Sequence, residues 1–129
     1  MDINKVKQDL LTRYNLKEIE TYFAIIDGKR TLTLNDFMNE MKKEFIFPQY
    51  YSGNLNSFLE IMNDLSWLNS FNYITIIINS KYLLMNENVL CQKELNELLT
   101  KITNEWKHVP NFENEEEYRK KSIFHIEYL

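Results

Sequence analysis

The stretch FPQYYSGNLNSFLEIMNDL, residues 47–65, decides how this chain of 129 residues folds. Pro48 ends the segment before it, because the residue that precedes a proline is pushed out of helical geometry. Gly53 can adopt backbone angles closed to other residues, and Asn54 is a favoured residue at a helix N-terminus. We therefore predict a short loop followed by a helix that starts at Leu55.

The predicted helix has two faces. Apolar side chains recur at intervals of three and four residues, the spacing of a buried helical stripe; they are Leu55, Phe58, Ile61, Met62 and Leu65. Asn56, Glu60 and Asp64 lie one turn apart on the opposite side. The helix should therefore present an amide and two carboxylates outward, beside a loop that carries Tyr50 and Tyr51. Aromatic side chains next to carboxylates are typical of a recognition surface.

This stretch resembles the barstar family, the intracellular inhibitors of barnase-type secreted ribonucleases. The residues that carry the resemblance are Pro48, Tyr50, Tyr51, Asn54 and Leu55, together with Ile26-Asp27-Gly28 and the run from Phe37 to Phe45. The resemblance extends from about Tyr22 to the C-terminus. It implies an α/β fold in which helices surround three parallel strands, and an inhibitor whose helix enters the active site of the enzyme. Glu60 stands where the family places its principal acid.

Three residues depart from the family pattern. Asn56 stands where an acid is usual, Leu59 where a tryptophan is usual, and Ser52 where a glycine is usual. Asn56 removes one negative charge, which weakens electrostatic steering toward a basic enzyme. Glu60 is one methylene longer than an aspartate and fits poorly into a cleft shaped for the shorter acid. We therefore expect a different cognate nuclease and poor inhibition of the archetypal one.

Length, charge and composition limit the possible functions. The chain has the length of one domain, and 44% hydrophobic residues are ample for one core. Fifteen basic and nineteen acidic residues give a formal charge of −4. This balance disfavours direct binding of nucleic acid, which requires a basic surface, and suits a basic protein partner such as a secreted nuclease.

The sequence also predicts a location. Charged residues interrupt the N-terminal segment, so it lacks the apolar centre of a signal peptide. The longest apolar run, around residues 74–78, is too short to span a membrane. The single cysteine, Cys91, cannot form an internal disulfide, and its apolar neighbours favour a small buried core residue. We expect a cytoplasmic protein.

The rest of the chain alternates strands and helices. Apolar runs at residues 22–26 and 73–78 predict strands buried on both faces, and residues 123–129 predict a less buried one. A helix capped by Thr33 or Asn35 should bury Phe37, Met38, Met41 and Phe45 and leave Lys42, Lys43 and Glu44 in solvent. Asn86 or Asn88 should cap a long helix that carries Leu90, Leu95, Leu98, Leu99, Ile102 and Trp106 and is closed off by Pro110. Residues 115–121 should form a charged surface segment.

This order predicts an α/β domain with a small parallel sheet, which agrees with the barstar-like fold. We predict that residues 1–19, which have an amphipathic pattern, form an N-terminal helical extension and that residues 20–129 form the barstar-like domain. The extension either packs on the edge of the domain or contacts a second copy or a partner.

We find no motif for an enzyme. The sequence has no Gly-x-Ser-x-Gly, no phosphate-binding glycine loop and no histidines at metal-binding spacing. His108 and His125 lie at a predicted helix end and in the last predicted strand. Glu60 and Asp64 lie one turn apart with nothing opposite them to form a cleft. We therefore expect neither catalysis nor a metal or other cofactor.

The predicted function is inhibition of a ribonuclease by an acidic helix and the Tyr-Tyr loop, in an immunity or antitoxin role. The predicted partner-binding residues are Tyr50, Tyr51, Gly53, Asn54, Leu55, Asn56, Leu59, Glu60, Asp64 and Glu105. The expected partner is a basic secreted nuclease, either a barnase-like ribonuclease or a toxin nuclease domain, and the free protein should be a monomer. Two alternatives remain: an immunity protein against a toxin of another chemistry, and an interaction module with no inhibitory role.

Overall fold

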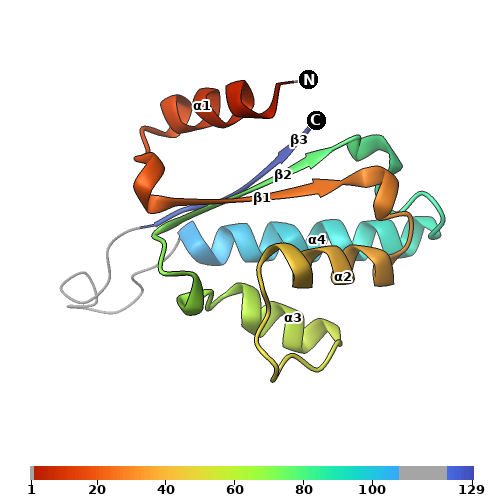
Figure 1. The fold of residues 1–129 in the computed structure, drawn as a ribbon. Coiled ribbons are helices and arrows are strands. Elements are labelled where there is room, and N and C mark those ends of the chain that lie inside the picture. The colour runs from red at the N-terminus through yellow and green to blue at the C-terminus, as the bar shows by residue number, and fades with distance from the viewer. Residues whose placement is uncertain (1, 108–121) are drawn as a thin grey trace.

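The computed structural model describes residues 2–107 and 122–129. Along the chain, the helices and strands are α1 (Ile3–Tyr14), β1 (Thr21–Asp27), α2 (Leu34–Glu44), α3 (Leu55–Met62), β2 (Asn72–Ile78), α4 (Val89–Lys107) and β3 (Phe124–Tyr128), joined in part by short 3-10 turns (Figure 1). The predicted α/β order is confirmed. The predictions for His108, for Pro110 and for the charged segment 115–121 concern residues outside those that the structure describes.

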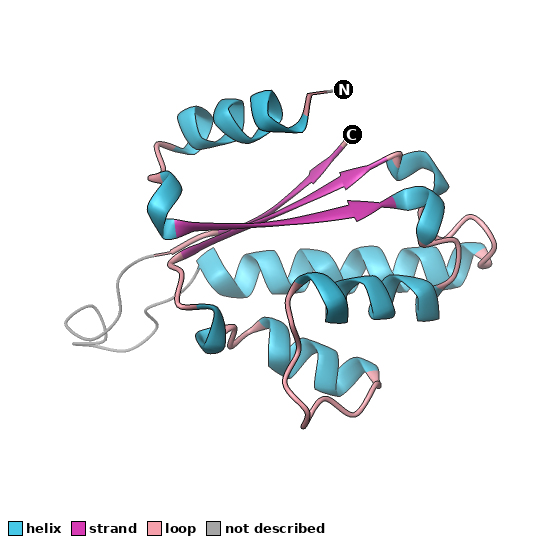
Figure 2. Ribbon diagram, in the orientation of Figure 1, coloured by secondary structure: helices cyan, strands magenta, loops and turns pink. Residues whose placement is uncertain are grey.

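One parallel sheet with the order β1-β2-β3 forms the centre of the fold (Figure 2). The register pairs Thr21 with Asn72 and Tyr73 with Phe124. β2 is the middle strand, and six of its seven residues are buried. The run from Ile74 to Ile78, four isoleucines interrupted by Thr75, suits this position, because β-branched side chains favour extended backbone and both faces of the strand are covered.

Helices cover the sheet in layers (Figure 1). α2 and α4 lie on one face and bury a core that includes Phe37, Met41 and Ile102. α1 lies on the other face, where Leu10 joins a smaller cluster with Ile74 and Ile76. α3 contacts α4 and lies on the far side of the helical layer from the sheet. Within the described ranges, no helix has both the length and the apolar content needed to cross a membrane.

Side-chain caps settle where two helices begin. The Thr33 hydroxyl accepts a hydrogen bond from the Asp36 amide at 3.1 Å, so Thr33 rather than Asn35 caps α2. The Asn88 side chain accepts from the Cys91 amide at 2.8 Å and thus caps α4. Cys91 itself is only half-buried at the edge of the core, so the prediction of a buried core residue is wrong. It lies in the first turn of α4, which projects beyond the sheet.

The prediction that Glu44 is simply solvated is also wrong. Its carboxylate accepts a hydrogen bond from the Ile25 amide at 2.8 Å, on the outer edge of β1. Its backbone carbonyl accepts a hydrogen bond from the Tyr22 hydroxyl. The end of α2 therefore satisfies a backbone donor that an edge strand would otherwise expose.

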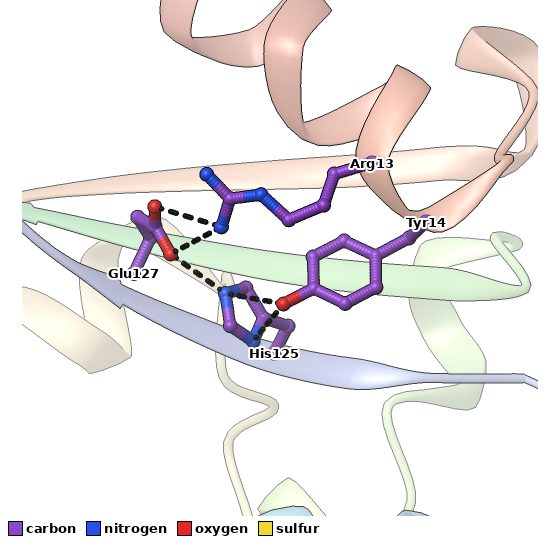
Figure 3. A network of polar contacts seen from close by, with 4 residues as sticks. All are labelled: Arg13, Tyr14, His125 and Glu127. Carbon is purple, nitrogen blue, oxygen red and sulfur yellow. Dashed lines mark hydrogen bonds and ion pairs between the residues drawn. The ribbon is translucent and has the colours of Figure 1, made fainter.

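A polar network fastens α1 to the last strand (Figure 3). The Arg13 guanidinium donates to both carboxylate oxygens of Glu127 at 3.1 Å. His125 Nε2 lies 2.9 Å from the same carboxylate, and the Tyr14 hydroxyl lies 3.3 Å from the His125 ring nitrogens. Burial raises the pKa of Glu127, but the hydrogen bonds with His125 and Arg13 outweigh it and hold the pKa below its usual value.

This network predicts a pH-dependent contribution to stability. A carboxyl group whose pKa is lowered by folding stabilises the folded chain above its unfolded-state pKa, and this contribution disappears as the pH falls through the folded-state pKa. Glu127→Gln should therefore lower the free energy of unfolding at neutral pH, and the difference from the unmutated protein should shrink in acid. Urea unfolding of both proteins across this range measures it. A difference that stays constant with pH would contradict the assignment.

Leu10 should be the main apolar anchor of α1, since none of it is exposed. Leu10→Ala should lower the free energy of unfolding by about 2–5 kcal/mol, because it leaves a cavity over β2. Gln8→Ala, at an exposed position of the same helix, is the matched control and should change it by less than about 0.5 kcal/mol. Equal effects in chemical denaturation would show that α1 is only loosely packed.

Candidate partner-binding site

The junction between the loop and α3 is closed by side-chain hydrogen bonds. Gly53 has a φ of 83° with open space around its α-carbon, so backbone conformation rather than crowding requires glycine here. The Asn54 side chain accepts from the Ser57 amide at 2.8 Å and donates to the Ser52 hydroxyl at 3.0 Å. The Ser57 hydroxyl accepts from the Ser52 amide at 3.0 Å. Asn54 is confirmed as the cap, and its side chain is committed to shaping the loop.

The other end of α3 is fixed by α4. The Trp106 indole donates a hydrogen bond to the Met62 carbonyl at 2.9 Å, at the C-terminus of α3 where carbonyls lack helical partners. Phe58 and Ile61 anchor the middle of the helix in the core. α3 is therefore held at both ends and along its buried face.

The predicted helix is wrong at three residues. α3 ends at Met62, so Asp64 lies in the turn after the helix rather than one helical turn beyond Glu60. Leu65 is buried but has a left-handed backbone with a φ of 53°, which ends the helical path. Leu55, expected in the buried stripe, is 42% exposed, because the first residue of α3 extends past the core.

The outer side of α3 carries negative charge next to an aromatic ring. Asn56, Glu60 and Asp64 are exposed, and Tyr50 is 64% exposed. Desolvation, followed by the negative charges of Asp64 and Glu60, raises the pKa of the Tyr50 hydroxyl. The phenol therefore lies within electrostatic reach of both carboxylates. No hydrogen bond or ion pair joins the Glu60 carboxylate to any residue in 2–107 or 122–129.

The two neighbouring tyrosines occupy different environments. The Tyr51 ring meets Phe47 edge to face, with the centroids 4.9 Å apart, and packs against the core. Its buried hydroxyl has no hydrogen-bond partner among the described residues, and burial raises its pKa. Tyr50 faces outward instead. The predicted pair is thus divided into an exposed ring and a packed one.

The remaining predicted residues border this surface. Glu105 of α4 accepts a hydrogen bond from the Asn63 side chain, which brings a further carboxylate to the end of α3. Leu59 is half-buried against the core. No local sequence pattern indicates the role of Asn63, because its partner lies 42 residues away.

This surface is suited to recognition. Within the part of the chain that the structure describes, no three His, Cys, Asp or Glu residues are grouped to hold a metal ion. Carboxylates on the exposed side of this helix and in the turn after it offer hydrogen-bond acceptors and negative charge. Such groups complement the arginine, lysine and histidine donors of a cationic pocket.

Comparison with known proteins identifies a family for most of the chain. Residues 21–124 match the family model described as Barstar (barnase inhibitor). The match begins at the first residue of β1 and includes α2, α3, β2 and α4, whereas α1 lies outside it. No individual curated protein matches the chain. The match confirms the family that residues 47–65 indicate.

The cap of α3 can be tested on its own. Asn54→Ala should lower the free energy of unfolding by about 1 kcal/mol, because the Ser57 amide loses its acceptor. Asn54→Asp keeps an acceptor at the same place and should retain most of the stability. Thermal and urea unfolding measure both. If the aspartate variant is as unstable as the alanine variant, the capping bond is not what holds this junction.

Proposed function

Because the chain belongs to the barstar family, whose members are barnase inhibitors, we propose that it occludes the active site of a ribonuclease with α3 and the preceding loop. The observation that carries this proposal is the exposed carboxylate of Glu60 on a helix fixed at both ends. No described residue neutralises that carboxylate through a hydrogen bond or an ion pair. Its negative charge is available to a partner.

Glu60 supplies the central contact in this proposal. A ribonuclease binds the phosphate of its substrate with arginine, lysine and histidine donors, whose geometry also suits a carboxylate. The Glu60 carboxylate accepts these hydrogen bonds in place of the phosphate and contains no bond that the enzyme can cleave. The enzyme is blocked because its own phosphate-binding groups are occupied.

Tyr50, Asp64 and Glu105 surround that contact. Tyr50 buries a large, rigid ring against the enzyme at a low cost in conformational entropy. Asp64 and Glu105 add negative charge, which speeds association with a basic enzyme and makes it sensitive to salt. Since α3 is already ordered in the free protein, little further entropy is lost when the complex forms.

The other predicted residues have supporting roles. Gly53 and Asn54 shape the loop, while Leu55, 42% exposed, and the half-buried Leu59 provide apolar contacts beside Glu60. Tyr51 positions Tyr50 by packing on Phe47, and its half-buried side chain adds a contact at the border of the surface.

The partner in this proposal is a basic secreted nuclease other than the archetypal one. Asn56 provides an amide where the family pattern has an acid, so the cognate cleft needs one positive charge fewer at that point. The protein acts as a cytoplasmic monomer that protects the producing cell. Its residues 20–129 form the inhibitory domain, to which residues 1–19 are an extension.

The direct test is an RNA-cleavage assay. The cognate enzyme is captured on the immobilised protein, purified, and titrated with the inhibitor and with Glu60→Gln. The variant should inhibit at least about 30-fold more weakly, because central interface residues contribute about 2 kcal/mol or more. Glu18→Gln removes the same charge from an exposed turn outside α3 and its loop, and should inhibit like the unmutated protein.

Two results would count against the proposal. RNA digestion that continues at saturating inhibitor would exclude active-site occlusion for that enzyme. Equal inhibition by the Glu60 and Glu18 variants would remove Glu60 from the centre of the interface.

A further inference from the structure

One exposed residue has a backbone conformation that its side chain disfavours. Six non-glycine residues among those described have a positive φ: Asn15, Ile46, Leu65, Asn69, Asn79 and Leu84. Asparagine tolerates this region. Leu65 and Leu84 are almost completely buried, so their packing offsets the strain. Ile46, with a φ of 51°, is 63% exposed and β-branched, the kind of side chain for which this conformation is a true outlier.

The end of α2 imposes this conformation. The Phe47 amide donates to the Lys42 carbonyl at 3.0 Å, and the Ile46 amide approaches the Lys43 carbonyl at 3.4 Å. These two bonds form a Schellman motif, in which the residue at the position of Ile46 is left-handed and is usually glycine. The fold alone would therefore favour a residue with no β-carbon here.

The neighbours of Ile46 hold its backbone in place. Phe45 is fully buried and Phe47 is 9% exposed, so both flanking side chains are anchored in the core. The Trp67 indole also donates to the Phe45 carbonyl at 2.9 Å. Ile46 is thus an apolar side chain on a rigidly held backbone. Because it is mostly exposed, it adds little stability to offset its strain. Strained residues of this kind are found preferentially at functional sites.

Its position fits the proposed interface. Tyr50 lies four positions after Ile46 in the chain, so their α-carbons lie no more than about 14 Å apart. A stable interface covers about 800 Å² on each partner, which is wide enough to include both. Ile46 and Tyr50 are exposed residues in the connection between α2 and α3, and the exposed Leu55 follows as the first residue of α3.

We infer that Ile46 is a partner-contact residue, which packs on an apolar patch of the ribonuclease beside its cationic cleft. This inference rests on the proposed function and extends its contact surface to the end of α2. Ile46 contributes affinity and helps to select the enzyme, since a carboxylate alone would fit any phosphate-binding cleft. Its side chain stabilises the complex, whereas its strained backbone destabilises the free protein.

The test uses two opposite readouts. Ile46→Gly should leave the melting temperature unchanged or higher, because glycine suits a left-handed backbone. The same variant should inhibit the captured ribonuclease about tenfold more weakly, because an apolar side chain is lost from the interface. Ile46→Leu keeps an apolar side chain and should inhibit within about twofold of the unmutated protein.

Parallel measurements with Glu60→Gln separate the possible outcomes. If Glu60→Gln weakens inhibition and Ile46→Gly does not, the inference about Ile46 is wrong while the proposed function stands. If Ile46→Gly lowers the melting temperature, the side chain serves the fold and the inference is also overturned. If the unmutated protein inhibits no ribonuclease that it captures, the proposed function fails and the inference fails with it.

Discussion

The structure depends on the burial of β2 from both sides. A parallel sheet exposes no face to water, because its hydrophobic strands need cover above and below. α1 covers one face, while α2 and α4 cover the other (Figure 1). α3 packs on the helical layer rather than directly on the sheet. One side of α3 is therefore left without cover, and this is the side that carries Glu60.

The candidate site takes its rigidity from its surroundings. A helix of eight residues is too short to be stable alone in water. Asn54 fixes its first turn, Trp106 binds its last carbonyl, and Phe58 holds its centre in the core. Rigidity matters for recognition because a carboxylate held in place loses little freedom when it binds. The loop before α3 is constrained as well, since Gly53 and Ile46 adopt left-handed backbone conformations.

The sequence predicts the fold well because its local signals agree with one another. The β-branched run of β2 and the turn around Gly53 and Asn54 indicate the strand and the start of α3 without tertiary information. The apolar stripe predicts too long a helix, because Leu65 continues the spacing of the stripe while its backbone turns left-handed. Tyr50 and Tyr51 are chemically identical, and only the fold separates them, since Tyr51 packs on Phe47 and the core while Tyr50 is exposed.

Other features depend on contacts between distant parts of the chain. Neither the bond from Asn63 to Glu105 nor the one from Ile25 to Glu44 follows from any local pattern. The sequence places Ile46 between two phenylalanines, but only the structure shows that both of these are buried while Ile46 is exposed. In the proposed complex, α3 and a substrate phosphate occupy the same site on the ribonuclease. Isothermal titration of the complex in the presence of a mononucleotide bound at the active site tests this claim directly. Competition for one site requires the apparent Kd to rise linearly with the concentration of free nucleotide, and an unchanged Kd on an enzyme saturated with nucleotide would contradict a shared site.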